Sequence, residues 1–394
     1  MSGNPLRRAL RPLSFAQIRW VTPVRRGAAD RRISAIYREM ERILGVISPP
    51  VALHSPAPDA LAACWVMLYE TLFAPGRMDR AAKEAVATAV SVGNSCPYCV
   101  TIHSTMLRTL DHVQGADAIE EDHTESIADP AVRAISEWAR ASVRADSAAG
   151  YEPPFPATHA PEAVGVAVVF HYFNRMVNVF VRDAPLPPLV PNAALPVVLP
   201  GLSLLMSWAY RHEAPPGASL DLLPAGPLPP ALSWSAGNTH IAQAFARASS
   251  AVEAAGRRSV PAAVRDLVLA QLAGWDGGPK GLSRAWADEA VEALPADQRP
   301  AGRLALLVAF ASYQVDDAVV AAVQATGVTD AALVELVSWA SLAAAGRASG
   351  WMWITGREPG WPRTSSQASS AQNPGSQDTS SEDTSSQGSS TPVS

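Results

Sequence analysis

The stretch that decides the fold is RAAKEAVATAVSVGNSCPYCVTIHS, residues 80–104. Its first half is rich in alanine and places small apolar residues at the spacing of a helix. Asp79 stands where a capping side chain is expected, and Gly93 stands where such a helix ends. The first half therefore predicts an amphipathic helix.

The second half predicts another helix that carries two thiols. Pro97 suits a first helical turn, because a proline there loses no hydrogen bond. Asn94 or Ser95 is the expected cap. Cys96 and Cys99 would then lie in the opening turn of this helix, directly after the short connection at Gly93.

The rest of the chain repeats the helical spacing, and short alternating runs of β-branched residues are missing. The predicted fold class is therefore all-α. Further helices are expected over residues 59–72, with Asp59 as the cap, over 130–146 and 161–181, and in the region from about Trp234 to about Trp353.

The composition limits the classes of function. The 394 residues, 48% of them apolar, are enough for two domains with buried cores. The net charge is −5 and only 17% of residues are charged, so no basic face suited to a phosphate backbone is expected. Nucleic acid is not a predicted partner.

No stretch predicts a membrane span or a secretory signal. The apolar run 161–181 is interrupted by His171, Asn174 and Arg175, and the run 185–210 is interrupted by prolines. The basic start of the chain has no apolar segment behind it. We expect a cytoplasmic protein without a membrane partner.

The three cysteines are too few for a disulfide scaffold. A close Cys-x-x-Cys pair in an intracellular protein is typical of catalysis or metal binding. Cys64 lies apart, in the apolar helical pattern LAACWVML, and is predicted to be a buried small side chain without a redox role.

The composition and the helical spacing along the chain predict five segments. They are an N-terminal arm (1–30), a helical domain with the cysteine pair (31–183), a Pro-rich connector (184–232), a second helical domain (233–356) and a Ser/Thr-rich tail expected to be disordered (357–394).

The two helical domains resemble one another, which predicts a duplication. Setting EAVATAVSVGNSCPYCVTIHS above RDLVLAQLAGWDGGPKGLSRA pairs Gly93 with Gly274. In this register the positions of Glu84, Cys96, Cys99 and His103 are taken by Arg265, Gly277, Lys280 and Arg284. The second copy is therefore expected to be degenerate and without redox chemistry.

Four residues form a constellation that suits thiol chemistry. Cys99 and His103 are one helical turn apart, and Cys96 precedes Cys99 by one turn. The start of a helix favours the thiolate, the form that attacks peroxides and disulfides. Glu84 lies on the preceding helix and could polarise His103. The alternative for Glu84 is an ordinary surface pair with Arg80.

A CPYC sequence has two other common uses. A glutaredoxin would need a buried strand before the cysteines, whereas AAKEAVATAVSV predicts a helix. Structural zinc could use Cys96, Cys99, His103 and Glu84 as ligands, but it usually recruits a second Cys or His pair, and the other histidines are dispersed. We predict no metal and keep the zinc site as an alternative.

The motif Glu-x11-Cys-x2-Cys-x3-His, as it stands at Glu84, Cys96, Cys99 and His103, resembles that of the AhpD-like alkylhydroperoxidases in the carboxymuconolactone decarboxylase superfamily. The resemblance extends loosely over residues 35–182 and faintly over the second half. Members are all-helical homo-oligomers that reduce peroxides with the cysteine pair. The resemblance implies that Cys99 attacks the peroxide, that Cys96 resolves it, and that Glu84 and His103 relay protons.

One position departs from that pattern. AhpD has a histidine between the cysteines, where this chain has Tyr98, and a phenol with a pKa of about 10 is a poor base. This predicts slow hydroperoxide turnover or a different natural substrate. Lactone decarboxylation, the reaction for which the superfamily is named, is less favoured because it does not call for a thiol pair.

Besides Tyr98, two further residues are second-rank site candidates. His171 and Asn174 lie in an apolar helix and are replaced by Ala343 and Gly346 in the second copy, so they disappear together with the cysteines. The alternative is a buried polar network, because polar groups in such a helix need partners. Arg175 is kept as Arg347, which indicates a role in packing or at an interface.

The predicted function is that of a thiol-dependent peroxidase or general thiol–disulfide oxidoreductase. The expected partners are a peroxide, an external dithiol (dihydrolipoamide or a thioredoxin-like protein) and further copies of the chain. No flavin or nicotinamide motif is present, so no cofactor is predicted. The competing hypothesis is a non-enzymatic oligomeric redox sensor or scaffold.

Overall fold

The computed structural model describes residues 11–110, 113–149, 152–185, 191–194, 197–198, 201 and 214–355. The described part lies within a single compact unit, Met1–Arg357. The predicted tail and much of the predicted connector lie outside the described residues.

The described residues form an all-α fold, as predicted, and contain no strand beyond one isolated bridge between Ile18 and Val181. The helices of the first half are α2 (Arg31–Ile43), α3 (Pro49–Ala52), α4 (Pro58–Leu68), α5 (Arg80–Gly93), α6 (Pro97–Thr109), α7 (Val113–Glu120), α8 (Pro130–Ala141), α9 (Ala145–Ala149) and α10 (Ala160–Phe180). Those of the second half are α12 (Thr239–Ser259), α13 (Ala262–Ala273), α14 (Ala285–Val291), α15 (Arg299–Ala311), α16 (Asp317–Gln324) and α17 (Asp330–Thr355).

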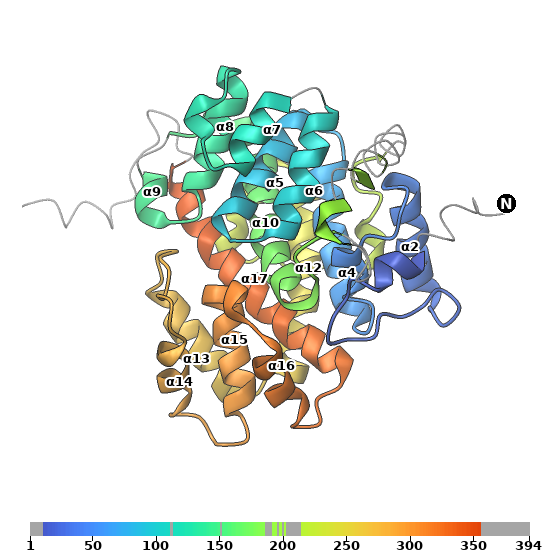
Figure 1. Ribbon diagram of the computed structural model, residues 1–394, viewed down its shortest axis with the longest axis vertical. Coiled ribbons are helices and arrows are strands. Elements are labelled where there is room, and N and C mark those ends of the chain that lie inside the picture. The colour runs from blue at the N-terminus through green and yellow to red at the C-terminus, as the bar shows by residue number, and fades with distance from the viewer. Residues whose placement is uncertain are drawn as a thin grey trace, which may run out of the picture. The chain divides into compact units, whose positions relative to one another are not determined.

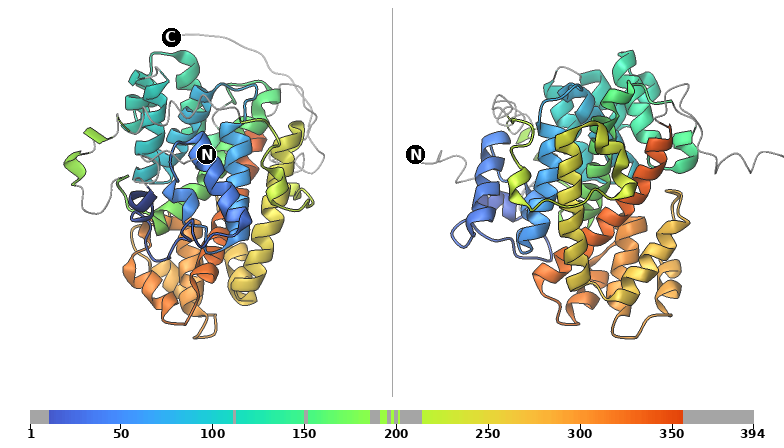
Figure 2. Two further views of the ribbon diagram at one scale, coloured as in Figure 1. Left: turned by 90° about the vertical axis from the view of Figure 1, so that its right-hand side faces the viewer. Right: turned by 180° about the vertical axis from the view of Figure 1, so that it is seen from behind.

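Two long apolar helices hold the unit together. In Figures 1 and 2, α10 and α17 run through the middle, with α5 to α9 at one end and α13 to α16 at the other. Helix α10 packs along α17, and α4 packs along α12. Each pair joins a helix of the first half to a helix of the second half.

The start of α4 differs from the prediction. The helix begins at Pro58 after Ala57, and Asp59 lies inside the first turn, where it pairs with Arg32. Proline already fits the first helical position, so no capping side chain is needed there. The predicted helix 59–72 also changes type after Leu68 and continues as a π-helical turn, Tyr69–Phe73.

The helix pair that carries the cysteines forms as expected, with one correction. Asp79 caps α5 by accepting a hydrogen bond from the Ala82 N–H, and the helix ends at Gly93. The position before Pro97 is taken by Cys96, so neither Asn94 nor Ser95 caps α6. Ser95 instead takes a positive φ of 53°, which turns the chain sharply between the helices.

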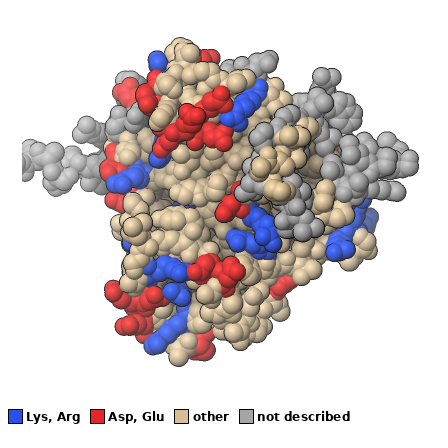
Figure 3. All heavy atoms as spheres, in the orientation of Figure 1, with Lys and Arg blue, Asp and Glu red and all other residues tan. Residues whose placement is uncertain are grey.

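Helix α10 is long and apolar enough to cross a membrane by length and composition alone, which differs from the expectation for this run. However, 94% of its apolar window is buried inside the fold, as in a core helix. The face in Figure 3 carries small groups of acidic and basic side chains, separated by wide uncharged areas.

The second half departs from the first where the cysteines would be. Helix α13 ends at Ala273, but the chain then stays irregular until α14 begins at Ala285. Gly277, the counterpart of Cys96, has a φ of 89°. A Cβ there would lie 2.1 Å from the backbone oxygen of Val143. A side chain at this position is therefore excluded by both backbone conformation and space.

Candidate active site

The two sulfur atoms of the motif lie side by side. Cys96 Sγ is 2.7 Å from Cys99 Sγ, and both are free thiols. Cys96 precedes the first residue of α6 and Cys99 lies in its first turn, so the bend at Ser95 and the helix itself bring the sulfurs together. Cys64 is also buried, and its thiol donates a hydrogen bond within α4, to Leu61 O.

Only one of the paired thiols lines a cavity. Cys99 is among the residues around a partly open cavity of about 410 Å³, whereas Cys96 is not among the described lining residues. Burial raises the pKa of Cys96, and the neighbouring Cys99 side chain raises it further, against the opposing effects of the Cys99 N–H and Asn174. Cys96 is thus held as a neutral thiol behind Cys99.

A buried carboxylate joins α5 to α6. Glu84 is fully buried, and its Oε2 lies 2.6 Å from His103 Nδ1. Its Oε1 accepts hydrogen bonds from Arg80 Nε at 2.8 Å and from Nη2 at 2.6 Å. The surface alternative for Glu84 is therefore wrong: the pair with Arg80 exists, but the carboxylate is inside the protein.

The charge of Glu84 is kept despite its burial. Burial acts to raise its pKa, but Arg80 and His103 outweigh that effect, and the net pKa is lowered. An anionic Glu84 accepts the Nδ1–H of His103, which leaves the lone pair on Nε2, an atom without a hydrogen bond to the described residues. His103 also packs edge-on against Phe170, with ring centroids 4.5 Å apart.

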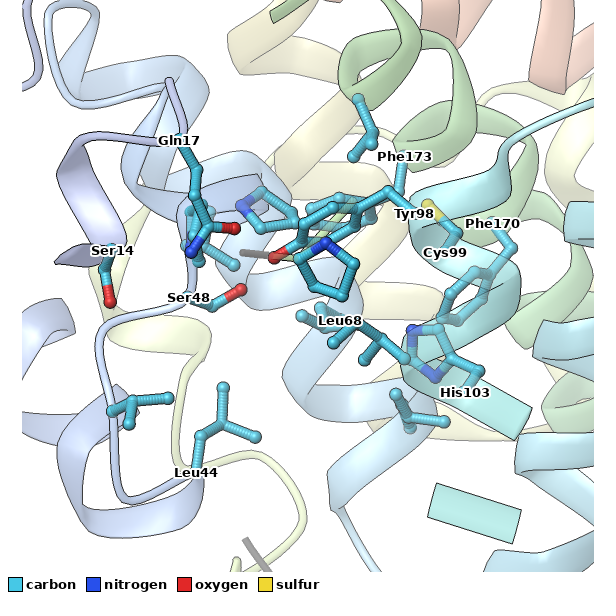
Figure 4. Close-up of a pocket in the computed structure, with 18 of the residues that line it drawn as sticks. Ser14, Gln17, Leu44, Ser48, Leu68, Tyr98, Cys99, His103, Phe170 and Phe173 are labelled. Carbon is cyan, nitrogen blue, oxygen red and sulfur yellow. The ribbon is translucent and has the colours of Figure 1, made fainter. Parts of the chain in front are cut away.

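The cavity is mostly apolar. The side chains of Leu44, Leu68 and Phe173 line it, with Cys99 and His103 at one side (Figure 4). The volume lies in the range of small-molecule sites. Leu72 and Phe73 also contribute from the π-helical turn, a feature frequent at functional sites.

Tyr98, a second-rank candidate, is turned away from the proposed chemistry. Its ring extends across the cavity from the cysteine side toward the side where Gln17 and Ser48 lie (Figure 4). Burial raises the pKa of Tyr98, so the phenol stays neutral.

His171 and Asn174 lie in a buried polar network behind the cysteines. Asn94 Nδ2 donates to Asn174 Oδ1 at 3.0 Å and is 3.1 Å from His171 Nδ1. Asn174 Nδ2 donates to Ser91 Oγ at 2.9 Å. Asn174 also favours the thiolate of Cys96, whereas burial lowers the pKa of His171 and keeps it neutral. The buried polar network is therefore present, and a role of His171 or Asn174 in the chemistry stays a prediction.

Arg175 lies between the two halves, as a packing role requires. Its Nε donates to Ala309 O at 3.2 Å, and its guanidinium lies 5.8 Å from the ring centroid of Trp275. Its counterpart Arg347 donates to Trp275 O at 2.9 Å. Both arginines therefore contact the same residue of the second half.

No group of three or more His, Cys, Asp or Glu side chains among the described residues is placed to hold a metal ion. Glu84, a ligand in the zinc alternative, has both carboxylate oxygens occupied by Arg80 and His103.

Sequence reasoning missed the parts played by Arg80, Asn94 and Phe170. Arg80 was visible as a partner one turn from Glu84, but the burial of the pair was not. The contacts of Asn94 and Phe170 join α10 to the cysteine helices across more than sixty residues, and no local pattern signals them.

Comparison with known proteins places the site in a family. The model of the carboxymuconolactone decarboxylase family matches residues 58–141, which include all four motif residues. Over 332 residues the chain is 36% identical to alkyl hydroperoxide reductase Rv2159c of Mycobacterium tuberculosis, covering 84% of this chain and 93% of that protein. No solved structure matches the chain significantly. The chain belongs to the carboxymuconolactone decarboxylase family, in agreement with the AhpD-like resemblance of its motif.

Proposed function

We propose that the protein is a thiol-dependent peroxidase in which Cys99 attacks the peroxide and Cys96 resolves the product. The observation that carries the proposal is the asymmetry of the pair: the sulfurs are 2.7 Å apart, but of the two only Cys99 lines the cavity. The name of the mycobacterial relative, an alkyl hydroperoxide reductase, supports a peroxide substrate.

The first step transfers one oxygen atom. His103 Nε2 takes the proton of the Cys99 thiol, and the thiolate attacks the distal peroxide oxygen. An S–O bond forms, the O–O bond breaks, and the proton on His103 passes to the leaving alkoxide. Cys99 becomes a sulfenic acid and the product is an alcohol. Glu84 positions His103 and stabilises its protonated form, while Arg80 keeps Glu84 ionised.

The second step closes the disulfide. The Cys96 thiol condenses with the sulfenic acid of Cys99 and releases water. An external dithiol, such as dihydrolipoamide or a thioredoxin-like protein, then reduces the disulfide by exchange and is itself oxidised. Assembly into a homo-oligomer and a degenerate second copy of the domain belong to the same proposal.

Steady-state peroxide consumption with dihydrolipoamide as the reductant tests the function. Cys99→Ser and Cys96→Ser are each expected to abolish catalytic turnover, whereas Cys64→Ala, which removes a buried thiol outside the site, retains it. A single stoichiometric oxidation without turnover in the unmodified protein would favour the sensor hypothesis. Turnover that survives Cys99→Ser would overturn the assignment.

A further inference from the structure

The side of the cavity opposite Cys99 carries polar groups that the proposed chemistry does not use. Ser14, Gln17 and Ser48 lie there, across the apolar middle from Cys99 and His103 (Figure 4). Ser14 and Gln17 are buried. This side therefore offers hydrogen-bonding groups in a place shielded from bulk water.

One of these groups, Gln17, lacks a good hydrogen-bond partner among the described residues. Gln17 Oε1 is buried without a hydrogen bond to the described residues, and Gln17 Nε2 makes only a long contact of 3.5 Å with Leu13 O. The phenol of Tyr98, which extends toward this side, has no hydrogen-bond partner among the described residues either. A buried polar atom without a partner costs free energy. A ligand group at this position would remove that cost.

The backbone that carries Gln17 is firmly anchored. Arg19 N donates to Phe180 O at 2.7 Å, and Arg182 N donates to Gln17 O at 3.2 Å, on either side of the bridge between Ile18 and Val181. The segment is therefore fixed to the end of α10, the helix that also supplies Phe170 and Phe173 to the cavity. Gln17 is held at a defined place relative to Cys99.

The charge of the lining limits what the polar side would accept. Among the described lining residues, Arg80 is the one that carries a permanent charge, and it is engaged by Glu84 and by Leu72 O. None of the described lining residues near Gln17 is a cation. An anionic group placed there would lose its hydration without gaining a counter-ion.

We propose that this cavity selects elongated, uncharged hydroperoxides that carry a second, neutral hydrogen-bonding group remote from the O–O bond, such as a hydroxyl, ester or amide. The O–O bond lies at Cys99, the alkyl chain fills the apolar middle, and the remote group binds Gln17 and its neighbours Ser14, Ser48 and Tyr98. The substrate class rests on the proposed peroxidase function, but the binding subsite does not.

The test uses binding of redox-inert analogues to the full chain, measured by titration calorimetry. Decanediol, decanol and decanoate share a chain length and differ in the second end group. The diol is expected to bind several-fold more tightly than decanol, and decanoate more weakly than either. In Gln17→Leu the advantage of the diol over decanol should fall to near unity. In Gln17→Arg decanoate should become the preferred ligand.

Gln243→Leu is the matched control, because Gln243 is an exposed glutamine on α12 outside the cavity. It should keep the diol-to-decanol ratio of the unmodified protein. Equal affinities for diol and decanol, or tightest binding of decanoate by the unmodified protein, would overturn the subsite.

Turnover of hydroperoxides that carry the same end groups as these ligands separates this proposal from the proposed function. Loss of all peroxide turnover with the binding pattern intact would refute the peroxidase alone. Turnover with no discrimination among the end groups in binding would refute the subsite alone.

Discussion

Glu84 and His103 are nineteen residues apart in the chain, yet Glu84 Oε2 lies 2.6 Å from His103 Nδ1 inside the protein. The contact depends on the turn between α5 and α6, and Arg80 holds the other carboxylate oxygen. The histidine at the cavity is thereby fixed in one tautomer by a buried anion.

Replacing Glu84 by Gln tests this arrangement. The amide keeps the shape but removes the charge, so His103 loses the anion that stabilises its protonated form and Arg80 loses its ion pair. We expect peroxide turnover to fall by at least about 10-fold and the free energy of unfolding by about 1–3 kcal/mol. Stopped-flow peroxide assays and urea titrations measure the two effects.

Glu39→Gln is the control for that change, because Glu39 pairs with Arg42 on a partly exposed face of α2. Such a pair contributes about 1 kcal/mol or less. Equal losses of turnover in the two variants would contradict a special role for Glu84.

Asn174 should affect closure of the disulfide between Cys96 and Cys99 more than the oxidation of Cys99 by peroxide. Asn174→Leu removes the amide that contacts Ser91 and Asn94 and favours the thiolate of Cys96. We expect slower disulfide closure with little change in the rate of sulfenic acid formation, together with a loss of about 1–3 kcal/mol in stability. Rapid-quench mass spectrometry resolves the two steps.

Asn178→Leu provides the comparison for Asn174, one turn further along α10. Asn178 donates to Ser312 Oγ at 3.0 Å and makes a long contact of 3.4 Å with Asn94 O, and among the described residues it has no hydrogen bond to either cysteine. A closure rate that falls as much in this variant would assign the effect to general packing of α10.

His54 should make the fold sensitive to acid. Burial lowers its pKa from 6.5 to about 3, while its Nε2 lies 2.8 Å from the Tyr172 hydroxyl. Between about pH 6.5 and pH 3 the unfolded chain binds a proton that the folded chain excludes, so stability falls as the pH falls through this window.

His54→Gln should reduce that dependence, since glutamine does not titrate, while His171, whose pKa is also lowered by burial, keeps its own contribution. Urea unfolding at pH 7 and at pH 5 measures the slope of stability against pH. His123→Gln, at an exposed position, should leave the slope unchanged. Parallel slopes for the unmodified protein and His54→Gln would refute the prediction.

Gly277 should resist substitution more strongly than Gly281. Both glycines have a positive φ, 89° and 87°, but a Cβ meets Val143 only at Gly277, and open space lies around Gly281. Gly281→Ala is expected to cost about 1–2 kcal/mol from backbone strain alone. Gly277→Ala should exceed that cost by at least about 1 kcal/mol from the clash. Thermal unfolding compares them, and equal costs would exclude the clash.

Much of the fold follows from local chemistry. Asp79 and Gly93 bound α5 as their residue types predict, and Pro97 opens α6. The errors came from positions where two local rules compete: proline at the start of α4 makes a cap by Asp59 unnecessary, and Cys96 takes the position expected for Asn94 or Ser95.

The site was only partly predictable, because the residues that surround the four motif residues come from distant segments of the chain. Helical spacing places Cys99 and His103 on one helix, and the short turn brings Glu84 near them. The contacts of Phe170 and Asn174 depend on how α10 packs against α5 and α6. The polar side of the cavity depends on Gln17, which the bridge at Ile18 holds in place. Tertiary packing of this kind leaves no periodic signal.

The most direct test of the central claim is to expose Cys96→Ser to one equivalent of organic hydroperoxide and to locate the oxidised residue by mass spectrometry after trapping with dimedone. In Cys96→Ser we expect a sulfenic acid adduct on Cys99. In the unmodified protein we expect a disulfide between Cys96 and Cys99 instead of the adduct. The opposite result would contradict it: a sulfenic acid adduct on Cys96 in Cys99→Ser, and none on Cys99 in Cys96→Ser.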